Sequence, residues 1–118
     1  MPTLIFLKLG GSLITEKARP HTPRMDVIRQ VADEIRQVLI ANKAVKILLG
    51  HGSGSYGHMP AQKHGTRQGV TSPRAWHGFA EVWHQASTLN RIIIDCFVEA
   101  GVSAVAFPAS SAASCSRG

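Results

Sequence analysis

The chain has 118 residues, of which 44% are apolar and 17% charged, and its 13 Lys and Arg against 7 Asp and Glu give a formal net charge of +6. This apolar share excludes a disordered chain, and the length suffices for one domain with a core or for part of a larger domain. Two cysteines, Cys96 and Cys115, are too few for a disulfide framework, and no apolar run approaches the roughly 20 residues of a membrane helix, so we expect reduced thiols, a cytoplasmic protein and no membrane partner.

The first half of the chain is predicted to alternate between strand and helix. Residues 3–9 form a short apolar run that ends at two glycines, which is typical of a buried strand. Residues 12–24 are polar, contain two prolines and indicate a loop. Apolar residues then recur every three or four positions over 25–41, which predicts a helix with one apolar face, and residues 44–49 predict a second strand.

The second half continues the alternation after an irregular stretch. Residues 51–72 are rich in Gly, His, Ser and Pro, and we expect only a short helix there, near 59–64. Ser72-Pro73 is a suitable start for a long helix that reaches about Ala100. Residues 102–107 are predicted to form a third strand, and residues 109–118 are predicted to form no helix or strand.

This order of elements predicts an α/β protein with a parallel sheet and right-handed crossovers. A three-stranded parallel sheet with both outer strands unpaired is a poor place for a domain to end, because such sheets are normally covered on both faces. We therefore expect the chain to be the N-terminal part of a longer α/β protein.

A glycine pair follows the first predicted strand, in the sequence Lys8-Leu9-Gly10-Gly11-Ser12. Glycine lets backbone N–H groups approach an anion closely, and Lys8 adds a positive charge beside them. Lys17 is close enough in sequence to reach the same anion. A tight turn with a solvent-exposed lysine is the alternative interpretation.

A second glycine-rich loop, Gly50 to His58, follows the second predicted strand. Gly52, Gly54 and Gly57 match the G-x-G-x-x-G dinucleotide fingerprint, but the acidic residue that this fingerprint needs about 20 positions later is missing. The loop therefore predicts phosphate binding by N–H groups at a strand end and a helix start, without indicating a dinucleotide.

The histidines, serines and basic residues allow further interpretations. His58 closes the second loop where a phosphate would sit, and His51 is expected to orient that loop. The histidine spacing matches no zinc pattern, so we expect no metal ligands in the chain. A serine nucleophile at Ser53 or Ser55 lacks an evident base-and-acid relay. The basic residues are scattered, which makes a nucleic-acid-associated domain a weaker alternative, and we expect no nucleic-acid partner.

Together these residues resemble a known superfamily. The segment from Lys8 to Ser12, with Lys17 shortly after it, resembles the opening of the amino acid kinase superfamily. Within it, Gly52-Ser53-Gly54-Ser55-Tyr56-Gly57-His58 resembles the second loop of the isopentenyl phosphate kinase family, and Phe107-Pro108-Ala109-Ser110 is similar to that family's segment after the third strand. Fosfomycin kinases share a similar loop and remain an alternative.

The resemblance implies a three-layer αβα sandwich with a mainly parallel sheet. It implies ATP-dependent phosphorylation of isopentenyl phosphate to the diphosphate, with ATP and Mg²⁺ as cofactors. It covers only the N-terminal half of a family member, so residues 1–118 would be the phosphate-acceptor side, without the C-terminal nucleotide-binding half. We expect this chain to be inactive alone, and a non-catalytic phosphate-binding fragment or another small-molecule phosphate kinase stays an alternative.

The same resemblance implies roles for individual residues. Binding of the ATP phosphates would fall to Lys8, Gly10, Gly11, Ser12 and Gly54. Lys17 would stabilise the transferring phosphoryl group, and His58 and the backbone at Ser53 would hold the acceptor phosphate. The residues that act in catalysis would be Lys8, Lys17 and His58. The apolar face formed by Trp83, Leu89 and Ile93 is expected either to pack in the core or to form a homodimer interface.

Overall fold

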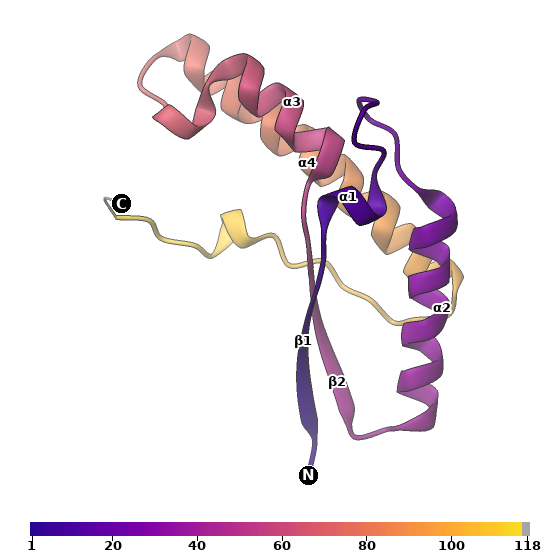
Figure 1. Cartoon of the computed structure of the whole chain (residues 1–118). Coiled ribbons are helices and arrows are strands. Elements are labelled where there is room, and N and C mark those ends of the chain that lie inside the picture. Colours follow the sequence, from indigo (N-terminus) through magenta and orange to yellow (C-terminus); the bar gives the residue numbers. More distant parts are fainter. Residues whose placement is uncertain (117–118) are drawn as a thin grey trace.

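The computed structural model describes residues 1–116 and contains a two-stranded parallel sheet, formed by β1 (Thr3–Leu9) and β2 (Val45–His51). Thr3 pairs with Val45 at one end, and Leu9 pairs with His51 at the other. Both strands therefore end side by side, at the edge where α1 and α3 follow them (Figure 1). The first strand has its predicted bounds, and the second is shifted by one or two residues.

Two long helices cover one face of the sheet, α2 (Met25–Ala41) and α4 (Pro73–Glu99), and both were predicted. Ser72 caps α4, because its Oγ accepts a hydrogen bond from the N–H of Ala75 at 3.1 Å. The buried core combines residues from both helices, β1, α1 and α3: Leu9, Ile14, Ile28, Ala32, Ile35, Tyr56, Leu89, Ile93, Cys96 and Phe97. Leu89 and Ile93 thus serve core packing, whereas Trp83 is exposed.

Two predictions about local structure are wrong near the strand ends. The predicted loop 12–24 begins inside a short helix, α1 (Gly11–Ile14). The short helix expected near 59–64 is longer, since α3 spans Gly54–His64 and passes through Pro60. A contact with Thr15, which is 40 residues away from Ser55, marks where α3 begins. The local sequence pattern cannot predict such a contact between distant residues.

The predicted third strand, Val102 to Phe107, is also wrong, because residues 102–108 form no strand. The N–H of Ala104 donates to the carbonyl of Val102 at 3.0 Å, a bend that interrupts an extended run. Val105 is 93% exposed and Phe107 is 78% exposed, so their burial does not hold the segment against β2. In Figure 1 it leaves α4 and runs past the strands without joining them.

A groove of about 630 Å³ lies where that strand was expected. It is lined by β2, α2, α4 and residues 101–107. The tail then forms one turn of 3₁₀ helix, η2 (Ala109–Ser111), although no element was predicted there. The last two residues of that stretch, 117–118, lie outside the described residues.

The α/β class and the parallel sheet are confirmed. The described residues supply the sheet and helices on one of its faces. Leu9, Ile47 and Leu49 contact the core on that face. On the other face, where side chains alternate outward, Leu4 is 56%, Phe6 73% and Leu48 53% exposed.

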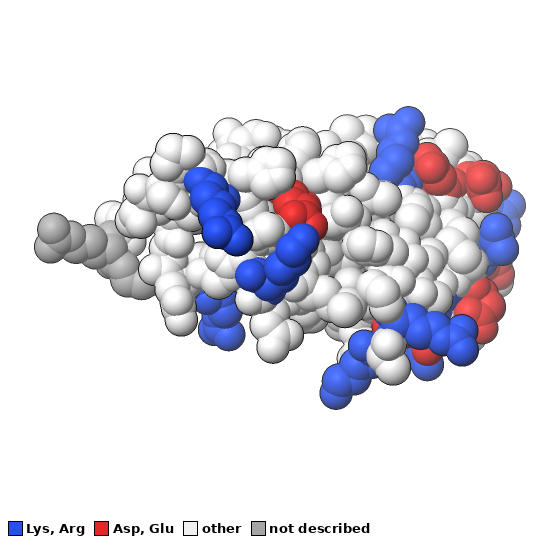
Figure 2. All heavy atoms as spheres, turned by 90° about the horizontal axis from the view of Figure 1, so that it is seen from above, with Lys and Arg blue, Asp and Glu red and all other residues white. Residues whose placement is uncertain are grey.

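Charges on the surface seen from above are dispersed (Figure 2). Lys and Arg stand singly or beside acidic residues on this face, with uncharged surface between them. The described part of the chain also contains no helix that is both long and apolar enough to cross a membrane.

The α3–α4 contact is fixed near the far end of α3. His64 Nε2 lies 2.5 Å from Glu81 Oε2, and Lys63 Nζ lies 3.8 Å from Glu81 Oε1. The His64 ring occupies the space beside Gly78, since a Cβ there would lie 2.5 Å from the ring. The hydrogen bond from His64, followed by the charges of Lys63 and His64, lowers the pKa of Glu81.

Changing Glu81 to Gln should therefore lower thermal stability at neutral pH and have no effect in acid. A carboxylate whose pKa is lowered by folding stabilises the fold fully above the ordinary glutamate pKa, and that contribution disappears as pH falls through the lowered value. Melting curves of both proteins across this window test it. Asp95→Asn, at the exposed Arg91–Asp95 pair, is the control and should leave the curve nearly unchanged. A stability difference independent of pH would contradict the prediction.

Candidate phosphate-binding site

The two glycine loops lie in direct backbone contact beyond the strand ends. A Cβ on Gly11 would lie 2.5 Å from the nitrogen of Gly54, and a Cβ on Gly52 would lie 2.7 Å from the nitrogen of Gly11. Side chains at these positions are excluded because real Cβ atoms do not approach other atoms so closely. The loops predicted to bind phosphate are therefore one continuous surface rather than two separate turns.

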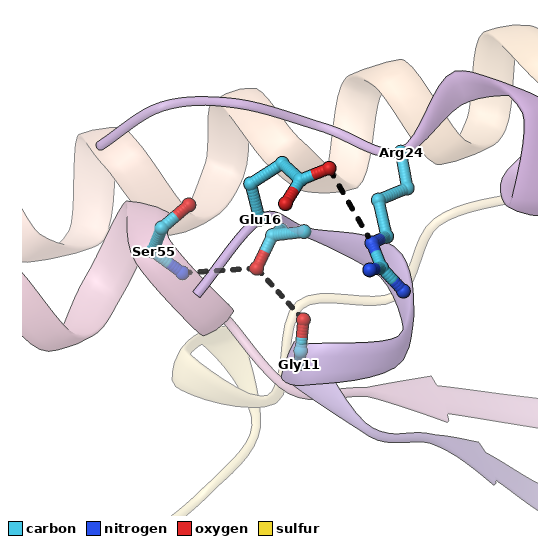
Figure 3. A network of polar contacts seen from close by, with 5 residues as sticks. Gly11, Glu16, Arg24 and Ser55 are labelled. Carbon is cyan, nitrogen blue, oxygen red and sulfur yellow. Dashed lines mark hydrogen bonds and ion pairs between the residues drawn. The ribbon is translucent and has the colours of Figure 1, made fainter. Parts of the chain in front are cut away.

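Thr15 joins the two loops through its buried hydroxyl (Figure 3). Its Oγ1 donates to the carbonyl of Gly11 at 2.7 Å and accepts from the N–H of Ser55 at 3.1 Å. Gly54 lies against the same hydroxyl with a positive φ of 50°. This contact ties the end of α1 to the beginning of α3.

Replacing Thr15 by Val should destabilise the fold by about 1–3 kcal/mol, because the change keeps the shape but leaves the Ser55 N–H without a partner, while the Gly11 carbonyl keeps only its bond from the backbone N–H of residue 15. Urea unfolding of both proteins measures the difference. Thr15→Ser keeps the hydroxyl and is the matched control, with a smaller loss expected. Equal losses for the Val and Ser variants would show that the hydroxyl bridge contributes nothing.

The segment that carries Lys17 is a hairpin-like loop closed at its base. Thr15 and Pro23 form an antiparallel bridge, and the N–H of Glu16 donates to the carbonyl of Thr22 at 2.8 Å. Glu16 also pairs with Arg24 at 3.7 Å, as Figure 3 shows. Lys17 therefore follows directly after the hydrogen-bonded base of this loop. It lies two residues after Thr15, whose hydroxyl joins the glycine loops.

Tyr56 connects α3 with this hairpin-like loop. Its hydroxyl donates to the carbonyl of His21 at 3.2 Å, and the two rings lie 5.4 Å apart. His21 has a positive φ of 51°. A tyrosine phenol is protonated at neutral pH and can donate this bond, and burial raises the pKa of Tyr56 further.

Several backbone N–H groups of the joined loops have no hydrogen-bond partner among the described residues. Within residues 1–116, the N–H groups of Gly11, Ser12, Ser53 and Gly54 donate no hydrogen bond to the protein. Groups of this kind at the starts of helices favour bound phosphate. The chemistry expected from the sequence is therefore available at this surface.

The predicted lysines are both exposed and unpaired. Within residues 1–116 neither Lys8 nor Lys17 forms an ion pair. Lys8 precedes the buried Leu9 in β1, so it lies on the sheet face that the helices leave open. Each lysine can therefore offer its full charge to a ligand.

Ser53 and His58 occupy the start and the second turn of α3. Ser53 is half-buried, with its Oγ against Gly57. His58 is exposed and lies one turn beyond Gly54 on the same helix face. It lines a hollow of about 410 Å³ together with Ala61, Gln62, Gly65, Arg67 and Gln68.

Three residues of this region escaped sequence reasoning: Thr15, Arg67 and Asn90. Thr15 fell in a stretch assigned to a loop, and Asn90 lies in the middle of a long helix. Arg67, which forms no ion pair in the described part of the chain, enters the hollow through a 3₁₀ turn, η1 (Thr66–Gln68). The one feature of the sequence that could have indicated Arg67 is a cationic side chain among residues typical of turns.

Comparisons with known proteins point to one family. Residues 3–118 match the amino acid kinase family. Isopentenyl phosphate kinase of Methanocaldococcus jannaschii is 32% identical over 117 residues, with 92% of this chain and 44% of that protein covered. The Thermoplasma acidophilum isopentenyl phosphate kinase is 30% identical over 108 residues, with 92% and 42% covered.

Solved structures give the same likeness. A product complex of the T. acidophilum kinase matches with a TM-score of 0.70 and 33% identity, covering 84% of this chain and 40% of that one. Another isopentenyl phosphate kinase structure matches with a TM-score of 0.82 and 28% identity, covering 92% and 45%. The chain thus spans less than half the length of the relatives it matches.

Proposed function

The chain belongs to the amino acid kinase family, and on that premise we propose that it forms the acceptor side of a kinase that transfers a phosphoryl group from ATP to isopentenyl phosphate. The observation that supports this most is the direct contact between the two glycine loops, which gathers free N–H groups at one surface. The relatives named isopentenyl phosphate kinase, together with a similar solved structure described as an isopentenyl phosphate kinase substrate complex, favour this acceptor over others.

The chemistry explains why such a surface suits the reaction. Transfer between two phosphates needs positioning and charge neutralisation rather than a covalent nucleophile. Both reactants are anions, so free N–H groups and unpaired lysines at the point of contact offset their repulsion. The joined loops supply both kinds of group.

We propose for these residues the roles that the family resemblance implies. The groups that would bind ATP phosphates are Lys8, Gly10, Gly11, Ser12 and Gly54. Lys17 would neutralise charge on the transferring phosphoryl group from the hairpin-like loop. The N–H of Ser53 and the imidazole of His58 would hold the acceptor phosphate at the start of α3.

Mg²⁺, which the proposed reaction would use, would be held mainly by the phosphates of the substrates. The described residues contain no cluster of three or more His, Cys, Asp or Glu side chains suited to a metal, and Glu16 is already paired with Arg24. The ion commonly binds through substrate phosphates and few carboxylates. The unpaired thiols of Cys96 and Cys115 agree with the cytoplasmic location that we propose.

A chimera tests the proposed function. Residues 1–118 are joined to the remaining part of the T. acidophilum relative and assayed with ATP and either isopentenyl phosphate or fosfomycin. Phosphorylation of isopentenyl phosphate is expected, and preference for fosfomycin would favour the alternative kinase. If neither acceptor reacts although the 118-residue chain binds phosphate, a non-catalytic phosphate-binding fragment is the better description.

His58 should contribute through one hydrogen bond to the acceptor phosphate. In the chimera, His58→Gln should keep part of the activity because the amide donates a similar bond, whereas His58→Ala should lose most of it. Initial rates at varied isopentenyl phosphate measure both. Comparable activity in the two variants would count against contact between His58 and the phosphate.

A further inference from the structure

His51 uses both nitrogens of its ring at the end of β2. Nδ1 lies 2.9 Å from the carbonyl oxygen of Gly52, and Nε2 lies 2.9 Å from Nδ2 of Asn90 in α4. The ring is half-buried between the second glycine loop and α4.

These two contacts fix the tautomer of the ring. A carbonyl oxygen only accepts hydrogen bonds, so Nδ1 of His51 must carry the proton and donate it. The neutral ring then has a lone pair on Nε2, which accepts from the amide of Asn90. The Gly52 carbonyl therefore requires the Nδ1–H form, and the Asn90 amide supports this form by donating from Nδ2 to Nε2.

The Gly52 carbonyl in turn sets the direction of a free N–H group. The peptide bond between Gly52 and Ser53 is planar and trans, so the carbonyl and the N–H of Ser53 point in opposite directions. Holding the carbonyl toward His51 points the Ser53 N–H away from it. That N–H donates to no other group in residues 1–116 and is the one assigned to the acceptor phosphate.

We propose that His51 and Asn90 are positioning residues for the phosphate surface: Asn90 supports the Nδ1–H form of His51, and His51 turns the Gly52–Ser53 peptide so that the Ser53 N–H faces the anion. This inference rests on the proposed function for its ligand. Neither residue touches the reacting atoms.

The test uses the 118-residue chain with inorganic phosphate as the probe. Nitrogen-15 spectra of the wild-type ring should show a protonated Nδ1 and an unprotonated Nε2 on His51. Asn90→Leu should reduce the preference for this form and weaken phosphate binding about fivefold, the loss expected for one neutral hydrogen bond. Thr88→Leu, at an exposed position of α4, is the matched control and should bind phosphate normally.

Two variants of His51 separate its two contacts. Asn in place of His51 retains a donor at the place of Nδ1 and should keep most of the phosphate affinity. Gln retains a polar group at the place of Nε2 but not at Nδ1, and should lose affinity as Asn90→Leu does. A purely structural role would lower the melting temperature of both variants without separating their affinities.

The outcomes distinguish this inference from the proposed function. A wild-type ring protonated on Nε2, or unchanged phosphate affinity in Asn90→Leu, overturns the positioning role while the phosphate surface stands. Absence of phosphate binding by the wild-type chain overturns both. Should Asn90→Leu fail to fold, the wild-type spectrum and the His51→Asn and His51→Gln pair still decide.

Discussion

Replacing Gly54 by Val should separate the two glycine loops and destabilise the chain by about 2–5 kcal/mol. A side chain at a positive φ costs about 1–2 kcal/mol, and overpacking adds about 1–3 kcal/mol. Gly54 has a φ of 50°, and a Cβ there would lie 2.7 Å from the Gly11 carbonyl oxygen and press on Thr15. Since domains are typically stable by only about 5–15 kcal/mol, this change should remove a large part of the free energy of unfolding and lower the melting temperature.

Thermal and urea unfolding measure this loss, and Gly50→Ala is the control. Gly50 lies in β2, and a Cβ there would meet nothing within 4 Å. Its substitution should leave the free energy of unfolding nearly unchanged. If Gly54→Val is as stable as Gly50→Ala, the loops are not packed as described.

Replacing Lys17 by Ala should lower kcat of the chimera by about 10²–10³-fold, the effect of removing one group that stabilises charge in a transition state. Stability should change by no more than about 0.5 kcal/mol, because Lys17 is exposed and unpaired. Steady-state rates and unfolding curves of the same protein preparations measure both quantities.

Lys43→Ala is the matched control for charge. Lys43 is also exposed but lies in the turn before β2, at the opposite end of the strands from the glycine loops. Its loss should leave kcat unchanged. Equal rates for the Lys17 and Lys43 variants would remove Lys17 from the reaction.

Periodicity was sufficient to predict the elements whose neighbours are mostly local. The spacing of apolar residues predicts the buried face of α2, and the Ser72-Pro73 pair predicts the start of α4. The two glycines after β1 predict where that strand ends. The order of strands also placed both glycine loops at one edge of the sheet, since parallel strands end together. These features depend little on partners far away in the chain.

Features created by distant partners could not be predicted. The hydroxyl of Thr15 meets Ser55, which is 40 residues away, and this contact marks where α3 begins. Asn90 and His51 are separated by 39 residues. Residues 102–107 have strand composition, but composition does not supply a neighbouring backbone with which to pair.

The uncovered face of the sheet limits the concentration at which the isolated chain stays in solution. Leu4, Phe6 and Leu48 expose adjoining apolar surface to water, and such surfaces promote aggregation at high protein concentration. Lys8 and Lys46 lie on the same face, on either side of those side chains, and their charges act as gatekeepers against stacking. Neutralising both lysines should therefore reduce the amount of protein that stays in solution, which light scattering would reveal before any binding is measured.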